Sequence, residues 1–225
     1  MSFALVKLSF NNPGDSNLEG GICGTGFFIG CNKGVTAHHV LNEGTFIPNS
    51  GYLHCYNWII TRKGRMIPIV KDDAQFFPEI ETTIINVDEM VSSDEIYELD
   101  SSSLEDDIPV KAFGHIGNAM PQIEASWNGP IFNVSSACLD STRCDAEGTV
   151  LRTVTMSINS ADIQLHGVKG FELSFPSRVG MSGGPVISAK TNKAIGMLSL
   201  GLPADCDIKK STFAVSAIEI SRFVE

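Results

Sequence analysis

Short apolar runs separated by turn residues extend along most of the chain. The runs are rich in β-branched and aromatic side chains, which favour strands, and 21 Gly and 10 Pro residues are scattered between and around them. Strands are predicted over 4–8, 26–29, 56–61, 66–70, 82–87, 109–113, 150–156, 171–175, 186–188 and 194–198. Helical signal is thin and is confined to a turn near 39–42 and the tail 216–224. The pattern therefore predicts an all-β fold, either a sandwich or barrels.

Length and charge narrow the class of protein. Of 225 residues, 43% are hydrophobic and 19% charged, which is enough apolar material for a sizeable core in one or two domains. The 16 Lys and Arg are outnumbered by 26 Asp and Glu, and nucleic-acid binding needs basic surface, so we expect no nucleic-acid partner. No apolar run approaches the ~20 residues that cross a bilayer. The start of the chain lacks a signal-peptide pattern, so we expect a soluble, cytoplasmic protein with no membrane contact.

The six cysteines do not have the spacing of a zinc site. They lie at positions 23, 31, 55, 138, 144 and 206, with no Cys-x-x-Cys pair and no finger-like grouping with His. An even number of cysteines is compatible with disulfides in a secreted chain. Without an export signal, free thiols are the better interpretation. We expect neither a metal nor a cofactor.

Acidic residues are concentrated in one window. Residues 72–107 contain 13 Asp and Glu and no Lys or Arg. Within this window, 91–107 is rich in Ser and acidic residues and is interpreted as a surface linker. A solvated surface is the simpler interpretation of its charge, and attraction of basic partners or substrates is the alternative.

Two glycine-rich segments contain the residue types that nucleophilic catalysis requires. The first comprises 24–30 and 34–41 and holds a pair of histidines, and the second is 179–187, where Ser182 is flanked by glycines. Little side-chain bulk surrounds such a serine, so backbone N–H groups can converge on the oxyanion of a tetrahedral intermediate. A serine hydroxyl is a weak nucleophile and needs a base, which a histidine in a strand-to-turn segment can supply.

These segments resemble the motifs of chymotrypsin/trypsin-like serine proteases. TAHHV at 36–40 resembles the family's Thr-Ala-x-His motif, and GMSGGP at 180–185 resembles its Gly-x-Ser-Gly-Gly-Pro motif. GTGF at 24–27 is similar to the strand that precedes the histidine, and SLG at 199–201 is similar to the strand that pairs with substrate backbone. The resemblance extends from about residue 4 to residue 224, although 88–170 agrees only in pattern.

The resemblance implies a double barrel and assigns its catalytic groups. We expect two antiparallel six-stranded β-barrels, over 1–100 and 108–225, with a short C-terminal helix. His39, the fourth residue of its motif, would be the general base and Ser182 the nucleophile. The backbone N–H groups of Gly180 and Ser182 would form the oxyanion hole. His38 is expected on the opposite side of the strand as a structural or surface residue.

The acid of the triad differs from the family pattern. The family has Asp at the head of a strand with an apolar run, and the matching stretch 80–88 has Glu81 there. A glutamate can also accept the imidazole Nδ1–H and stabilise the imidazolium. Its extra methylene changes the reach by about 1.5 Å, so the backbone or the rotamer must compensate. Asp72, Asp73 and Asp88 are the alternatives, and a Ser–His dyad is another.

Two further departures from the family pattern concern the activation switch and a disulfide. Met181 stands where secreted members have an Asp that pairs with a freed N-terminus, and Val40 stands where a disulfide cysteine follows the histidine. Both departures resemble intracellular, bacterial or viral branches of the superfamily, in which activity is set by loop ordering.

The same resemblance suggests a substrate pocket. Its expected residues are Pro176 and Ser177 at the base and Ser199, Leu200 and Gly201 along one wall. Residues 211–213 would form the other wall. None of these carries a charge, so we expect an apolar or small polar P1 side chain. Asp205 and Asp207 lie between the walls and would change this expectation if they faced the pocket.

The sequence therefore predicts a serine endopeptidase that acts on protein or peptide substrates. A catalytically defective, peptide-binding module with the same fold is one alternative. A protease that stays silent until a partner orders its loops is the other.

Overall fold

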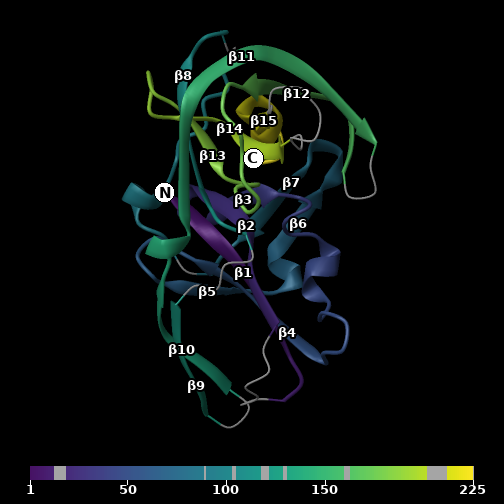
Figure 1. Cartoon of the computed structure of the whole chain (residues 1–225), viewed down its shortest axis with the longest axis vertical. Coiled ribbons are helices and arrows are strands. Elements are labelled where there is room, and N and C mark those ends of the chain that lie inside the picture. Colours follow the sequence, from purple (N-terminus) through teal and green to yellow (C-terminus); the bar gives the residue numbers. More distant parts are fainter. Residues whose placement is uncertain are drawn as a thin grey trace.

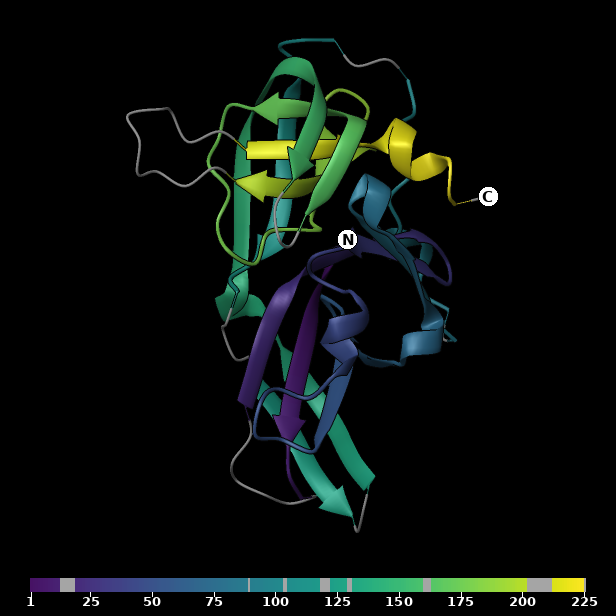
Figure 2. The ribbon, with the colours of Figure 1, turned by 90° about the vertical axis from the view of Figure 1, so that its right-hand side faces the viewer.

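The computed structural model describes residues 1–12, 19–88, 90–102, 105–117, 122–128, 131–159, 163–201 and 212–224. Two β-structures are stacked one above the other (Figure 2), with a separate two-stranded hairpin at one end. The strands are β1 (Ser2–Phe10), β2 (Glu19–Gly30), β3 (Lys33–Ala37), β4 (His54–Ile60), β5 (Met66–Ile69), β6 (Ala74–Phe77), β7 (Thr82–Asn86), β8 (Pro109–His115), β9 (Gln122–Asn128), β10 (Ile131–Cys138), β11 (Arg143–Asn159), β12 (Gln164–Leu173), β13 (Pro185–Ser188), β14 (Ala194–Gly201) and β15 (Thr212–Ser216). The short helices are the 3₁₀ turns η1 (Glu43–Phe46), η2 (Lys71–Asp73), η3 (Pro78–Ile80), η4 (Ser93–Glu95) and η5 (Asp140–Thr142), and α1 (Ala217–Ser221).

The N-terminal half forms a seven-stranded antiparallel sheet that curves into a half-barrel. Its strand order is β5-β4-β1-β2-β3-β7-β6 (Figure 1). Strand β1 alternates side chains between two buried faces, as a pleated strand must. Phe3 and Leu5 enter the larger core cluster, whereas Ala4, Val6 and Leu8 pack on the other face. The hairpin of β9 and β10 lies beside edge strand β5 of this sheet, which β10 contacts.

The C-terminal half forms a closed six-stranded barrel. Its order is β11-β12-β15-β14-β13-β8, and every pairing is antiparallel. Phe171 fills the interior and is fully buried. Gly196 makes room for it, because a Cβ at Gly196 would lie 2.7 Å from the Phe171 ring. A small residue on β14 therefore faces a large one on β12, which lets the barrel close around a packed core.

One hydrophobic cluster runs through both β-structures. Phe3, Phe27 and Ile84 of the sheet share it with Leu165 and Met197 of the barrel. Burial of a side chain of this size contributes roughly 1.5–3 kcal/mol, so the shared core ties the two β-structures together. Strand β12 also contacts η3, the turn that leads into Glu81.

The acidic segment between the two β-structures is more structured than a solvated linker. Tyr97 N–H donates to Phe28 of the sheet, and Asp100 N–H donates to Ala194 of the barrel. Val91 and Glu95 are buried. The acidic side chains Asp94 and Glu98 are exposed and pair with Lys63 and Lys193. The connection is therefore bonded to both β-structures along its described length.

The predicted fold class is confirmed. Each stretch predicted as a strand overlaps one, and the tail contains α1. The N-terminal sheet has seven strands where six were expected. Strands β3, β6, β9, β10 and β15 were not predicted. The cysteines in the described ranges, which exclude Cys206, are all free thiols. No helix within these ranges is long and apolar enough to span a bilayer.

Candidate active site

The antiparallel pair of β3 and β7 brings the histidine turn and Glu81 together. Ala37, the last residue of β3, is directly opposite Thr82, the first residue of β7. The residues just after Ala37 and just before Thr82 therefore meet at the same end of the pair. His38 N–H donates to the Glu81 carbonyl at 3.1 Å and closes this end.

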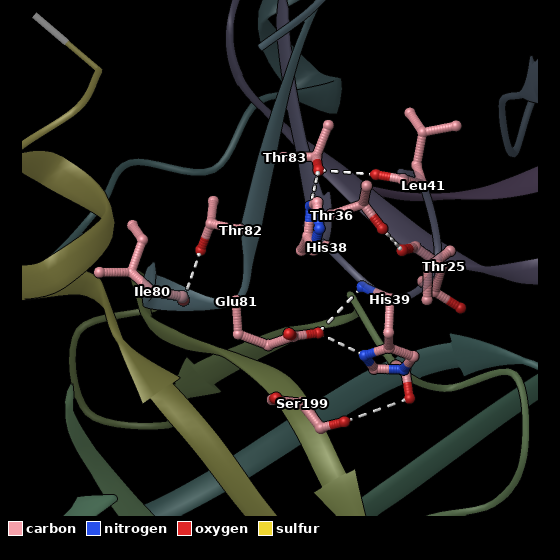
Figure 3. Close-up of polar contacts among 12 residues, drawn as sticks. Thr25, Thr36, His38, His39, Leu41, Ile80, Glu81, Thr82, Thr83 and Ser199 are labelled. Atoms are coloured by element: carbon pink, nitrogen blue, oxygen red, sulfur yellow. Dashed lines mark hydrogen bonds and ion pairs between the residues drawn. The ribbon is translucent and has the colours of Figure 1, made fainter. Parts of the chain in front are cut away.

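His39 and Glu81 form a two-point contact at this end (Figure 3). Glu81 Oε1 accepts from the backbone N–H of His39 at 3.0 Å and also contacts the ring Nδ1 of His39. The Glu81 side chain is fully buried, and the His39 side chain is 24% exposed. A buried carboxylate bonded to Nδ1 holds the proton there, so Nε2 keeps its lone pair for a substrate or a nucleophile.

The backbone of Glu81 has an unusual conformation. Glu81 has φ 56° and ψ 38°, a left-handed conformation that is uncommon for a residue other than glycine. It caps η3, where Glu81 N–H donates to the Pro78 carbonyl at 3.1 Å. Such a conformation costs on the order of 1–3 kcal/mol and persists only where the surrounding structure enforces it. Here η3 enforces it through Ile80, which is buried in the shared core.

The alternative acids lie elsewhere. Asp72 and Asp73 belong to η2, and the Asp73 carboxylate accepts from Val70 N–H at 2.9 Å. Asp88 is exposed beyond the far end of β7. Among the described residues, only Glu81 has a carboxylate bonded to His39.

His38 faces a different environment from His39. Its ring meets Phe76 edge-on, with 6.0 Å between ring centroids, and its Nδ1 lies 3.5 Å from Thr83 Oγ1. Burial lowers the pKa of His38 below its usual value, which the Glu81 carboxylate partly opposes. His38 is thus packed against the sheet rather than bonded to the Glu81 side chain.

Ser182 lies in a tight turn between the barrel and the sheet. Its carbonyl accepts from Thr25 N–H at 2.9 Å, which attaches the turn to β2. Gly183 has φ +85°, and a Cβ there would lie 2.0 Å from the Thr25 carbonyl oxygen. Only glycine fits such a close approach in this conformation. The Ser182 hydroxyl is half-buried and donates to the Ser199 carbonyl at 3.4 Å.

The N–H groups expected in the oxyanion hole have no acceptor in the part of the chain that the structure describes. Gly183 N–H donates to Leu198 and Met181 N–H donates to Arg178, at 2.7 and 3.0 Å. Within the described residues, the N–H groups of Gly180 and Ser182 donate to none. Two backbone donors without an acceptor in one turn are free to bind an oxygen from outside the chain.

The predicted pocket residues are spread over two segments. Pro176 is exposed and Ser177 is half-exposed in the loop that leads to Ser182. Ser199 is buried beside a register shift in β14, Leu200 is half-buried, and Gly201 ends the strand. Of these residues, Ser199 contacts the nucleophile, because its carbonyl accepts from the Ser182 hydroxyl. Asp205, Asp207 and Ser211 lie outside the described residues.

His115 is a buried titratable group behind the Ser182 turn. Its ring Nδ1 lies 3.1 Å from Thr142 Oγ1, and the Thr142 hydroxyl donates to Leu139. The ring must therefore donate to Thr142. Burial, with the positive charge of Arg143, lowers the pKa of His115 from its usual 6.5 to about 4. The neutral ring is the form that the fold accommodates.

We expect His115 to make the fold sensitive to mild acid. The unfolded chain takes up a proton at His115 near pH 6.5, whereas the folded chain does so only near pH 4, so the stabilising contribution is complete above pH 6.5. It should be lost progressively as the pH falls from 6.5 to 4, by about 3 kcal/mol in total. The measurement is the free energy of unfolding in urea across this range. His115→Gln should flatten the dependence and the exposed His166→Gln should not. Equal slopes in all three proteins would contradict the assignment.

Sequence reasoning missed Thr25 as part of this site. The GTGF segment at 24–27 was identified only as the strand before the histidine. The signal that could have found it is a hydroxyl between two glycines in a strand that must approach the Ser182 turn. The structure places the Thr25 hydroxyl 2.7 Å from the Gly180 carbonyl, to which it donates.

Comparison with known proteins gives fold relatives at low identity. No family model and no curated protein matches the sequence. Among solved structures, the active form of the Rv3671c protease from M. tuberculosis has a TM-score of 0.58 at 15% identity, over 97% of this chain and 78% of that one. The MamO protease domain from Magnetospirillum magneticum has a TM-score of 0.58 at 15% identity, over 99% and 96%. The HtrA-type protease AlgW with a decapeptide has 0.63 at 13%, over 98% of this chain and 63% of AlgW.

An inactive form of the Rv3671c protease matches equally well, with a TM-score of 0.59 at 15% identity. The match therefore does not distinguish an active protease from an inactive one. The structural neighbours are HtrA-type and trypsin-like serine proteases. This chain has their chymotrypsin-like double-barrel fold.

Proposed function

We propose that this protein is a serine endopeptidase. Ser182 would attack the peptide carbonyl, His39 would act as general base, and Glu81 would be the acid of the triad. The observation that carries the proposal is the buried Glu81 carboxylate bonded to both the backbone N–H and the ring Nδ1 of His39. A structural histidine has no need of this arrangement, whereas a base that must become positively charged during the reaction does.

The order of the proton transfers follows from the proton on His39 Nδ1. With Nδ1–H directed at Glu81, the lone pair on His39 Nε2 takes the Ser182 hydroxyl proton as the oxygen bonds to the substrate carbonyl carbon. The carbonyl oxygen gains the negative charge and would be bound by the unpaired N–H groups of Gly180 and Ser182. His39 then returns the proton to the leaving amine. Water repeats the same steps to release the acyl group from Ser182.

Substrate selection would depend on uncharged surfaces. Pro176 and Ser177 carry no charge, and a substrate Lys or Arg there would lose water without gaining a partner among the described residues. We therefore propose that apolar or small polar P1 side chains are preferred. The substrate backbone would pair with β14 at Ser199–Gly201, where a register shift interrupts the pairing with β15.

A second candidate is a peptide-binding protein or a protease that needs an activator. It is favoured by the contact of the Ser182 hydroxyl with Ser199 rather than with His39. Rotation about one side-chain bond would redirect this hydroxyl, and resting catalytic hydrogen bonds are often loose. If that rotation alone is sufficient for reaction, the chain cleaves peptides unaided. If it is not, the second candidate holds.

Peptide cleavage tests the proposal directly. The purified chain is incubated with a mixture of unlabelled peptides, and the products are mapped by mass spectrometry. We expect cleavage after apolar or small residues. It should be absent in Ser182→Ala and retained in the control Ser93→Ala, which changes an exposed serine in η4. Binding of peptides without cleavage would favour the second candidate.

A further inference from the structure

Thr25 makes more contacts with the Ser182 turn than a strand residue needs for its own pairing. The side chain is fully buried. Its N–H donates to the Ser182 carbonyl at 2.9 Å, and its hydroxyl donates to the Gly180 carbonyl at 2.7 Å. One residue of β2 thus holds the turn at two carbonyls, on either side of Met181.

The direction of the Thr25 hydroxyl is fixed by His115. The backbone N–H of His115 lies 3.0 Å from Thr25 Oγ1 and can only donate. The hydroxyl oxygen therefore accepts from His115, and its single proton is directed to Gly180. Loss of this hydroxyl would leave one buried donor and one buried acceptor unsatisfied.

The peptide groups flanking Gly180 are both held in one orientation. The Val179 carbonyl accepts from Gly117 N–H at 2.8 Å. In a planar trans peptide the N–H points away from the carbonyl, so Gly180 N–H is directed away from Gly117. On the other side, Thr25 binds the Gly180 carbonyl, and Met181 N–H donates to Arg178 at 3.0 Å. Rotation of either peptide group would break bonds that this arrangement satisfies.

We propose that Thr25 is a positioning residue that keeps the Gly180–Ser182 turn in the conformation presenting its two free N–H groups. The oxyanion hole is then formed at rest and requires no activating partner. This inference rests on the proposed function, which gives those N–H groups their purpose. Thr25 touches no reacting atom and acts through the carbonyls of Gly180 and Ser182.

The test compares variants that lose one buried hydroxyl each. Thr25→Val keeps the shape and removes the hydroxyl, whereas Thr25→Ser keeps the hydroxyl. The matched control is Thr61→Val, which is as deeply buried, lies in the turn between β4 and β5, and loses a 3.2 Å bond accepted from Arg65 N–H instead of a bond to the Ser182 turn. Thermal unfolding reports the general cost of each change. Cleavage kinetics and hydrogen exchange of the peptide spanning 178–184 report its effect on the turn.

We expect Thr25→Val to lower kcat by about 10- to 100-fold with little change in KM, because the oxyanion donors are displaced while substrate binding elsewhere is kept. Thr25→Ser should restore kcat, and Thr61→Val should keep it at a comparable loss of Tm. Hydrogen exchange in 178–184 should accelerate in Thr25→Val alone. If Thr25→Val does not fold, Thr25→Cys replaces it, since a thiol of nearly the size of serine is a much weaker donor.

Equal losses of kcat in Thr25→Val and Thr61→Val would overturn the inference, as would a rise in KM with kcat unchanged. A wild type that neither cleaves peptides nor reacts at Ser182 would refute the proposed function. Hydrogen exchange would then still decide the inference, because faster exchange in Thr25→Val than in Thr61→Val reports the turn itself.

Discussion

Ser182→Ala and His39→Ala should each lower kcat for peptide cleavage by about 10⁶, the largest effect that any single change in this chain can have. Removal of the nucleophile leaves no atom to form the acyl-enzyme, and removal of the base leaves the nucleophile protonated. Because the two groups act as one unit, the double variant should be no slower than either single one. The measurement is kcat under saturating peptide, with Tm recorded to verify folding.

The matched control for the histidine is its neighbour. His38→Gln removes an imidazole one residue away that packs against Phe76 and is not bonded to the Glu81 carboxylate. It should keep most of the activity. If His38→Gln were as inactive as His39→Ala while remaining folded, the assignment of His39 as base would be wrong.

Glu81→Gln should lower kcat by about 10⁴ with little change in KM. The amide has nearly the shape of the carboxylate, but it carries no charge to stabilise an imidazolium. Its NH₂ group can also donate to His39 Nδ1, which would place the ring proton on Nε2, where the lone pair is needed. The measurement is kcat and KM on the peptide cleaved fastest by the wild type.

Glu79→Gln is the control for this change. Glu79 lies in η3 two residues before Glu81, is exposed and carries the same charge. It should leave kcat near the wild-type value. A wild-type rate in Glu81→Gln would instead favour a Ser–His dyad.

The motif residues could be predicted because each motif is local in sequence. TAHHV at 36–40 and GMSGGP at 180–185 specify their turns by short-range glycine and strand patterns. Glu81 is expected from the family resemblance, which places the acid at the head of a strand, with Asp72, Asp73 and Asp88 as alternatives. The contact between Glu81 and His39 depends on the pairing of Ala37 with Thr82, which brings the histidine motif beside the strand that follows Glu81.

Other features could not be read from the chain because they depend on distant contacts. The left-handed backbone of Glu81 results from η3 being held by the shared core. The role of Thr25 depends on hydroxyl contacts with residues about 90 and 155 positions away. Strand β3 begins with Lys33 and Gly34, and β6 contains Gln75, so neither is a continuous apolar run, and it is their pairing with β7 that makes them strands.

The rate at which a fluorophosphonate labels Ser182 tests the central claim most directly, because this reagent requires an activated serine but no particular peptide. Rates are compared in the wild type, His39→Ala, Glu81→Ala and the control Glu79→Gln, with the labelled residue identified by mass spectrometry. The account predicts fast labelling at Ser182 in the wild type and control, and its loss in both His39→Ala and Glu81→Ala. Absence of labelling in the folded wild type, or labelling that is unchanged in His39→Ala, would contradict it.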